Sequence, residues 1–249
     1  GRSFAWRRKE SVAHGGVPHR TQKLLLTRIL DILTPLTTFV PVMDIAARKA
    51  KEKEDLKKAI LDAARELFLE QGYDRTSMRM IAQRIAYSPT TIYLYFKDKD
   101  AIFHALHTEA FQLLGARFAP LAHVADPMER LTAMGRVYLE FAQENPGLYD
   151  LMFIMKAPVQ ALEENDHLWE EGDRVFQVLM ATVDEAMKKK VMRRSDVEVT
   201  SFLIWSTVHG MAALYVRDRC FKVISEPKQG TLMDDALAQF TNWLRSFKP

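Results

Sequence analysis

The stretch from Ser88 to Lys99 reads SPTTIYLYFKDK and brings together hydroxyls, aromatic rings and cations. Groups of these kinds reach base edges, thymine methyl groups and phosphate oxygens when a helix lies in the major groove of DNA. Between Arg75 and Lys99, five basic residues stand against one acidic residue, a local charge of +4. This charge suits a phosphate backbone, so the stretch predicts a nucleic-acid interface.

Two short helices must position these side chains. The first is predicted over Ser77–Ile85, where Met78, Ile81 and Ile85 recur at spacings of three and four residues and form one inward stripe. A break follows at residues 86–88. Pro89 then opens the second helix, because proline has no N–H to lose in a first helical turn. Ile92 and Phe96 give this second helix its own buried stripe.

The residues from Gly72 to Leu106 read GYDRTSMRMIAQRIAYSPTTIYLYFKDKDAIFHAL. This segment resembles the DNA-binding domain of TetR-type transcriptional regulators. The order of its features carries the resemblance: a Gly-aromatic pair, a Thr-Ser cap, Ile-Ala inside the first helix, and Thr-Ile-Tyr-x-Tyr-Phe after the turn. The family usually has glycine at Ala86 and often at Thr90. A left-handed backbone at Ala86 would cost roughly 1 kcal/mol or more.

The resemblance implies roles for individual residues. Arg79 aligns with a position that reads a base edge, and an arginine fork can bind guanine N7 and O6 together. Base contacts are expected from Thr90, Thr91 and Tyr93, and phosphate contacts from Ser77, Tyr95 and Lys99. The full predicted DNA-binding set is Ser77, Arg79, Ser88, Thr90, Thr91, Tyr93, Tyr95 and Lys99. The alternative for this stretch is a plain helical hairpin that binds nothing.

Composition agrees with a soluble globular chain. The sequence has 249 residues, 48% hydrophobic and 27% charged, enough for one large or two small domains. Its single cysteine, Cys220, can form no internal disulfide, and a reducing cytoplasm is the expected location. The net charge of +3 is uneven, because residues 1–42 carry +5 and the remainder −2. Whole-chain charge therefore does not support nucleic-acid binding.

Three segments are predicted along the chain. Residues 1–42 are expected to be a non-native or disordered extension, since Met43 begins a sequence that reads as complete; a membrane anchor is the alternative. No apolar span there reaches the ~18 residues of a transmembrane helix, and no membrane partner is expected. Residues 43–100 form the predicted helix-turn-helix domain, and residues 101–249 the predicted helical ligand-binding and dimerisation domain.

The whole chain is expected to be all-α, with no strand-like alternation. The first helix is predicted from about Glu54 to Gln71, with Gly72 as its stop. Later helices are placed by caps and helical spacing: Asp98 to about Phe118, Asp126 to about Glu144, Asn145 to Met155, about Asn165 to Lys190, Ser195 to about Arg217, and Thr231 to about Phe247.

Two short segments extend the resemblance into the second domain. Residues 145–153, NPGLYDLMF, and 205–210, WSTVHG, are similar to the ligand-binding domain of a TetR subgroup named for its Trp-His-Gly motif. The predicted ligand-binding set is Phe141, Tyr149, Met152, Phe153, Trp169, Phe176, Trp205 and His209. Large adaptable side chains of this kind line pockets and also fill ordinary cores, so both readings stay open. His209 has the same alternative, as a satisfied core histidine.

A homodimer through the last two helices is predicted from small residues on one helix and large apolar residues on the other. The small residues are Ser206, Gly210 and Ala213, and the large ones are Leu237, Phe240, Trp243 and Leu244.

An enzyme is not expected. The sequence has no glycine-rich phosphate loop, nucleophile motif or zinc-ligand spacing, and no cofactor or metal is predicted. The expected function is a homodimeric repressor released from a palindromic DNA operator by a small apolar or aromatic effector. The alternative is a helical protein-interaction adaptor, or a regulator without a small-molecule inducer.

Overall fold

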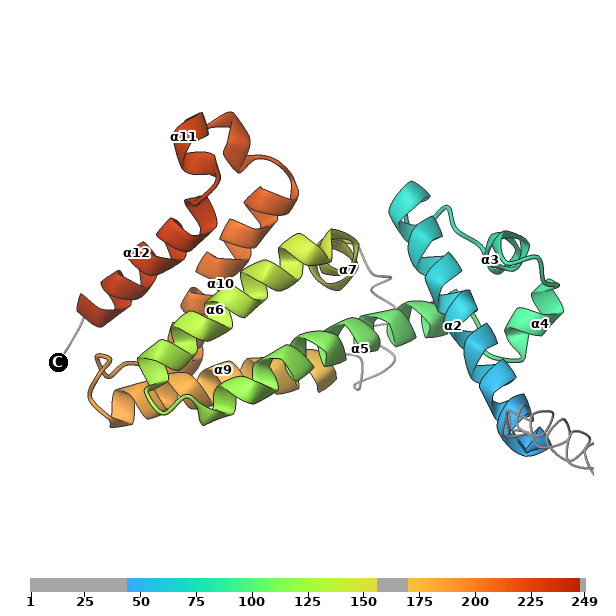
Figure 1. Cartoon of the computed structure of the whole chain (residues 1–249), viewed down its shortest axis with the longest axis horizontal. Coiled ribbons are helices and arrows are strands. Elements are labelled where there is room, and N and C mark those ends of the chain that lie inside the picture. Colours follow the sequence, from blue (N-terminus) through green and yellow to red (C-terminus); the bar gives the residue numbers. More distant parts are fainter. Residues whose placement is uncertain (1–43, 156–169, 247–249) are drawn as a thin grey trace, which may run out of the picture. The chain divides into compact units, whose positions relative to one another are not determined.

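The computed structural model describes residues 44–155 and 170–246, and these residues form helices and their connections with no strand. The all-α prediction is therefore confirmed for the described part of the chain (Figure 1). The described residues from 52 onward belong to one compact unit. The predicted extension over residues 1–42, the helix start at Asn165 and the helix end at Phe247 lie outside the described residues.

Three helices form the N-terminal part: α2 (Ile45–Gln71), α3 (Met78–Arg84) and α4 (Pro89–Tyr93). Helix α2 begins about nine residues before the predicted start at Glu54, because residues 45–53 are Ala, Lys, Arg, Glu and Ile with no helix breaker. The cap predicted at Ser77 is present, and Ser88 is a second cap that was not predicted from the sequence. The Ser77 hydroxyl accepts from Met80 N, and the Ser88 hydroxyl accepts from Thr91 N.

The turn between α3 and α4 has a left-handed backbone at Ala86. Ala86 has φ +59°, and Tyr87 N donates to Ala82 O across the turn at 2.9 Å. Alanine in this region costs about 1 kcal/mol that glycine would not. Gly72, which ends α2, has φ +88°. Ala86 therefore holds a strained left-handed backbone in the turn between α3 and α4.

Helix α5 (Lys99–Phe118) begins at the Asp98 cap, as predicted. Its first half and its second half belong to different hydrophobic cores. Ile102, Phe103 and Leu106 are buried with α2, α3 and α4. The residues further along, including Phe111 and Leu114, are buried in the bundle that follows. Helix α5 therefore continues past the predicted domain boundary at residue 100 and contributes side chains to both cores.

The bundle consists of α5 with α6 (Pro127–Glu144), α9 (Glu170–Lys188), α10 (Val197–Val216) and α12 (Leu232–Ser246). Figure 1 shows α9 running alongside α5, and α9 also packs on α6 and α10. Short elements connect these helices: η1 (Ala119–His123), α7 (Pro146–Tyr149), the π-helical η2 (Asp150–Ile154), η3 (Cys220–Lys222) and α11 (Glu226–Gln229).

One predicted cap is wrong. Helix α10 is capped by Asp196, whose carboxylate accepts from Val199 N at 2.8 Å. The Ser195 hydroxyl instead lies 2.7 Å from Thr200 Oγ1. A carboxylate at this position also complements the positive end of the helix dipole better than a hydroxyl does. The Asp126 cap of α6 is as predicted, because it accepts from Met128 N and Glu129 N.

Among the described residues, α10 is the one helix long and apolar enough to span a membrane by length and composition, and most of it is not buried. Three of its exposed apolar residues stand four and eleven residues apart, spacings that place them on one stripe of the helix. Val199, Leu203 and Leu214 are each more than half exposed, and open space surrounds Gly210 between them. The large predicted interface residues behave differently: Leu237, Phe240 and Leu244 pack inside the bundle, and Trp243 is 58% exposed.

His107 lies on α5 between the two cores. Its ring lies 6.2 Å from Phe103 and 4.8 Å from Phe111, and the imidazole hydrogen-bonds the backbone of Met152 in η2. Burial lowers the pKa of His107 to about 4, and the charge of His104 acts in the same direction. The imidazole is therefore neutral at neutral pH.

The stability of the protein should fall as pH drops from about 6.5 toward 4. The unfolded chain binds a proton on His107 in this range and the folded chain does not, so up to about 1.4 kcal/mol per pH unit is lost. Urea unfolding at pH 7.5 and pH 5.5 measures this. His107→Gln should lose less stability over that interval than the wild type, while the exposed His123→Gln should match the wild type. Equal pH dependence in all three proteins would contradict the assignment.

Candidate nucleic-acid interface and bundle cavity

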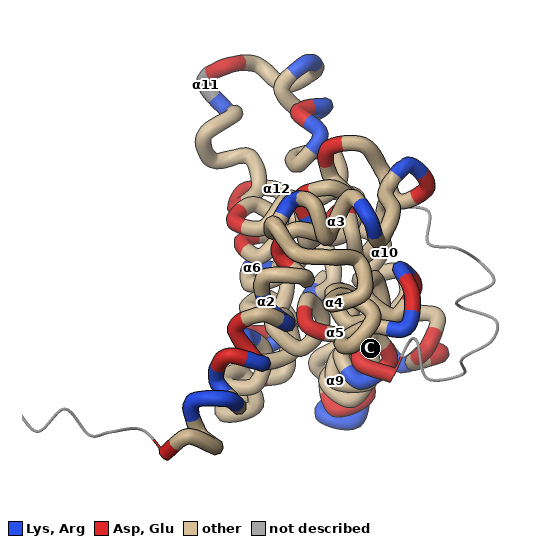
Figure 2. Tube along the Cα trace, turned by 90° about the vertical axis from the view of Figure 1, so that its right-hand side faces the viewer, with Lys and Arg blue, Asp and Glu red and all other residues tan. Residues whose placement is uncertain are grey.

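The short helices α3 and α4 present a surface that is polar and aromatic. Helix α3 carries two basic residues, Arg79 and Arg84, and α4 carries no charged residue, so its tube is tan in Figure 2. The exposed side chains of this surface include Arg79, Thr90, Tyr93 (54% exposed) and Leu94 (78% exposed). Ser77 and Ser88 are also exposed, although their hydroxyls already cap α3 and α4.

Thr91 was predicted to contact a base and Tyr95 to contact a phosphate, but both side chains are only partly exposed. The Thr91 hydroxyl is 2.9 Å from Ser88 Oγ and so belongs to the cap of α4. Tyr95 is half-buried and packs against the N-terminal core. Each can still contribute its outer edge to a partner, but each first fixes the position of α4.

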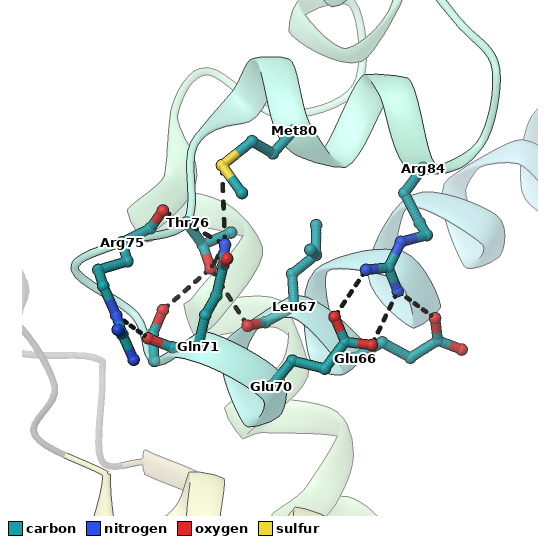
Figure 3. Close-up of polar contacts among 9 residues, drawn as sticks. Glu66, Leu67, Glu70, Gln71, Arg75, Thr76, Met80 and Arg84 are labelled. Atoms are coloured by element: carbon teal, nitrogen blue, oxygen red, sulfur yellow. Dashed lines mark hydrogen bonds and ion pairs between the residues drawn. The ribbon is translucent and has the colours of Figure 1, made fainter.

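Arg84 is committed to the fold. Its guanidinium bonds both Glu70 oxygens, at 3.1 and 2.7 Å, and Glu66 at 3.0 Å (Figure 3). The Arg84 hydrogen bond lowers the pKa of Glu70, which keeps this partner charged. The fork joins α3 to α2. Because two carboxylates compensate it, Arg84 contributes little to the +4 charge counted along this stretch.

A second set of contacts fixes the start of α3. The Thr76 hydroxyl is 2.9 Å from Gly72 O, and Gln71 Nε2 reaches Thr76 Oγ1 at 3.2 Å and Arg75 O at 3.3 Å (Figure 3). Thr76 is 2% exposed, so these bonds satisfy a buried hydroxyl. The set ties the end of α2 to the beginning of the helix that carries Arg79.

Lys99 also has an internal partner. Its ammonium donates to Tyr73 O at 2.7 Å and lies 3.9 Å from the centre of the Tyr73 ring. Burial lowers the pKa of Lys99. The residue predicted to hold a phosphate therefore joins α5 to the loop before α3. Lys97, which is 76% exposed, is the more accessible cation beside it.

The bundle contains a cavity of about 320 Å³, at the lower end of the range for small-molecule sites. Helices α5, α6, α9, α10 and α12 and the segment around Phe153 all contribute to its wall. Three predicted ligand-binding residues line it: Phe153, Phe176 and Trp205. Lining residues absent from the prediction are mostly aliphatic or aromatic, and they include Phe111, Leu114, Met134, Tyr138, Leu179, Val208 and Phe240.

The other predicted ligand-binding residues do not line the cavity. Phe141 and Met152 are buried in the bundle core at 0% and 3% exposure. Tyr149 and His209 stack at 5.4 Å behind the lining residue Tyr138. Trp169 lies outside the described residues. Helical spacing predicts which residues face the interior of the bundle. It does not predict which of these residues line a cavity.

Tyr138 connects the cavity to a small polar cluster. Its hydroxyl is 2.9 Å from His209 Nδ1 and accepts from Trp205 Nε1 at 3.4 Å. The Tyr149 hydroxyl is 3.0 Å from the same Nδ1 and donates to His209 O at 3.1 Å. Burial lowers the pKa of His209 and raises that of Tyr138 and Tyr149, so the cluster is neutral. Tyr138 shares its helical stripe with Met134 and Phe141, a signal that could have identified it.

This neutral cluster can exchange hydrogen bonds but holds no nucleophile or paired carboxylates. Among the described residues, no three His, Cys, Asp or Glu side chains are grouped to hold a metal ion.

Comparison with known proteins identifies both parts. Residues 60–106 match the model of bacterial regulatory proteins of the tetR family, and residues 131–240 match a tetracyclin repressor-like C-terminal domain. With the helix-turn-helix and the bundle, these matches define the class of each part: the chain has a tetR-family N-terminal domain and a tetracyclin repressor-like C-terminal domain.

Individual relatives agree with this class. The HTH-type transcriptional repressor Rv1474c of Mycobacterium tuberculosis is 42% identical over 60 residues, which are 24% of this chain and 32% of that protein, so the chain spans about a third of it. The repressor KstR of Rhodococcus jostii is 26% identical over 168 residues, 66% of this chain and 77% of KstR.

A solved relative shares the fold alone. FadR from Bacillus subtilis, in complex with stearoyl-CoA, aligns with a TM-score of 0.62 at 18% identity, covering 77% of this chain and 99% of that chain.

Arg79→Ala should relax preference at one base pair of a bound DNA site and leave stability unchanged, because Arg79 is exposed on the reading surface. A bidentate contact to guanine provides about 1–3 kcal/mol of discrimination. Arg84→Ala is the matched control on the same helix. It should lower the free energy of unfolding and weaken all sequences alike. Binding to a library of single-base variants measures both, and equal, sequence-independent losses would show that Arg79 reads no base.

Proposed function

We propose that the protein is a homodimeric repressor that binds a palindromic operator through α3 and α4 and leaves it when a small apolar molecule enters the bundle cavity. The similarity of residues 205–210 to the Trp-His-Gly subgroup supports an effector domain of that kind. The relatives' names add support from outside the chain: KstR is a repressor, and the FadR structure contains an acyl-CoA. The protein would act in the cytoplasm, where the DNA is.

The observation that carries this proposal is the split of residues 149–153 between two cores. Leu151, at 1% exposure, is buried with α2, α3 and α4. Tyr149 and Met152 are buried in the bundle core. Phe153 lines the cavity. A ligand that displaces Phe153 therefore acts on a five-residue segment whose Leu151 is buried in the hydrophobic core that also contains residues of α2, α3, α4 and α5.

A ligand can act through this segment only if it favours one arrangement. Equal affinity for the DNA-competent and DNA-incompetent arrangements would shift nothing. Helix α5 provides a second connection, because it contributes to both cores. A change of a few ångströms in the separation of two recognition helices is enough to prevent both from entering half-sites about one DNA turn, roughly 34 Å, apart.

The dimer is supported by the exposed stripe on α10. Residues Val199, Leu203 and Leu214 leave apolar surface uncovered on a helix whose other face is packed. Small residues at Ser206 and Gly210 lie within the stripe and permit a second helix to approach closely. Trp243 on the last helix, α12, is also exposed. A twofold partner that presents the same stripe would cover it.

Operator binding and dimerisation can be tested together. DNA selected from the region of its own gene, or from a random library, should yield a palindrome bound by the wild-type dimer. Leu203→Glu with Leu214→Glu should be monomeric in light scattering and should lose the palindrome, because charges replace the apolar stripe. Leu113→Glu, at an exposed apolar position on α5, is the control and should keep both properties. Failure to select any DNA, or a monomeric wild type, would contradict the proposal.

A further inference from the structure

The outward face of α4 combines an aliphatic side chain with hydroxyl and aromatic groups. Helix α4 carries no charged residue, and its tube is tan in Figure 2. Ile92 and Phe96 are buried in the N-terminal core at 0% and 7% exposure. Thr90 and Leu94 lie one helical turn apart on the opposite side of α4, with Tyr93 beside them, and all three are exposed. At 78% exposure, Leu94 presents nearly its whole side chain to solvent.

Polar groups before and after this face along the chain are bonded within the protein. The guanidinium of Arg84 is held by two carboxylates of α2. Lys99 donates to the Tyr73 carbonyl at 2.7 Å. The hydroxyls of Ser88 and Thr91 lie 2.9 Å apart and bond each other. The choice of bases beneath α4 therefore depends on the side chains of its outward face.

Leu94 can recognise one kind of group in a major groove. Its side chain neither donates nor accepts a hydrogen bond, so it cannot read the nitrogen and oxygen atoms that carry most of the groove's code. The apolar group exposed there is the C5 methyl of thymine. Cytosine has a hydrogen at the same C5 atom, and 5-methylcytosine has a methyl group. Contact with Leu94 therefore distinguishes pyrimidines by methylation at C5.

We infer that Leu94 is a specificity residue that contacts the C5 methyl of one thymine in each operator half-site, so that operator affinity follows C5 methylation at that position. The inference rests on the proposed function, because it assumes that α3 and α4 enter a major groove. It adds a residue that the predicted DNA-binding set does not contain. Leu94 N donates to Thr91 O at 3.2 Å, so the backbone that carries this side chain is part of the hydrogen-bonded end of α4.

Uracil in place of thymine tests the contact, because it removes the C5 methyl and keeps every hydrogen-bonding atom. An operator selected by the full-length wild-type protein is resynthesised with uracil at one thymine of one half-site at a time. Wild-type affinity should fall about three- to fourfold at one position, the loss expected for one buried methyl group. Leu94→Ala should bind the thymine operator more weakly than wild type does, and should bind the thymine and uracil operators equally.

Cytosine at the same position provides the reverse test. Wild-type binding should weaken when cytosine replaces that thymine, and 5-methylcytosine should recover about three- to fourfold of the loss. Leu94→Ala should not distinguish the two cytosines. Leu113→Ala is the control, at an exposed apolar position on α5, and should keep both wild-type differences. Because Leu94 and Leu113 are both exposed, neither variant should change the midpoint of thermal unfolding.

Three results would overturn the inference: no thymine at which uracil weakens wild-type binding, a uracil effect that Leu94→Ala retains, or equal affinity for cytosine and 5-methylcytosine. If a palindrome is selected and bound without the expected methyl differences, the proposed function stands and the inference fails. If the methyl-dependent site is a single half-site bound by a monomer, the inference stands and the proposed homodimer fails. Failure to select any DNA would contradict both.

Discussion

The arrangement of the molecule depends on five consecutive residues whose side chains are shared between two hydrophobic cores. Leu151 is buried in the hydrophobic core that α2 to α5 share, whereas Tyr149 and Met152 are buried in the bundle core. The contact continues at Gly147, where a Cβ atom would lie 2.5 Å from Leu69 Cδ1 of α2. Because close-packed cores resist small displacements, this segment cannot move in one core without repacking the other. Helix α5 adds a second rigid connection between the same two cores.

The shape of the surface that α3 and α4 present depends on two cations, Arg84 and Lys99, that are held by intramolecular contacts. Arg84 is held by Glu66 and Glu70, and Lys99 is held by the carbonyl and ring of Tyr73. These contacts fix α3 to α2 and α5 to the loop before α3. What remains exposed is Arg79 with hydroxyl, aromatic and aliphatic groups on α4. Such a surface is expected to rely more on base edges and methyl groups, and less on phosphate charge, than the count of basic residues suggests.

Local signals in the sequence predicted much of this fold. Ser77 and Asp98 mark helix starts by capping and Pro89 does so as a first-turn residue, because these signals act within a few residues. The early start of α2 was missed, since a run of mixed charge reads equally well as a solvated loop or as a helix.

The bonds of Arg84, 14 and 18 residues from their partners, and of Lys99, 26 residues away, have no local signature. The cavity lining also depends on contacts between residues far apart in the sequence, so only some of its residues were predicted. Trp205 and Phe153 were identified as lining residues, but Tyr138 was not, because periodicity shows an inward face and not the neighbour opposite it.

The central claim is that the cavity and the DNA-binding helices share their energetics through Leu151. The most direct measurement is the ratio of operator affinities with and without a cavity ligand, compared between wild type, Leu151→Ala and Leu139→Ala. Both variants shorten a buried leucine, but Leu139 belongs to the bundle core alone. The account predicts a ratio well above one in wild type and in Leu139→Ala, and a ratio near one in folded Leu151→Ala. A wild-type ratio of one, or a ratio that Leu151→Ala leaves unchanged, would contradict it.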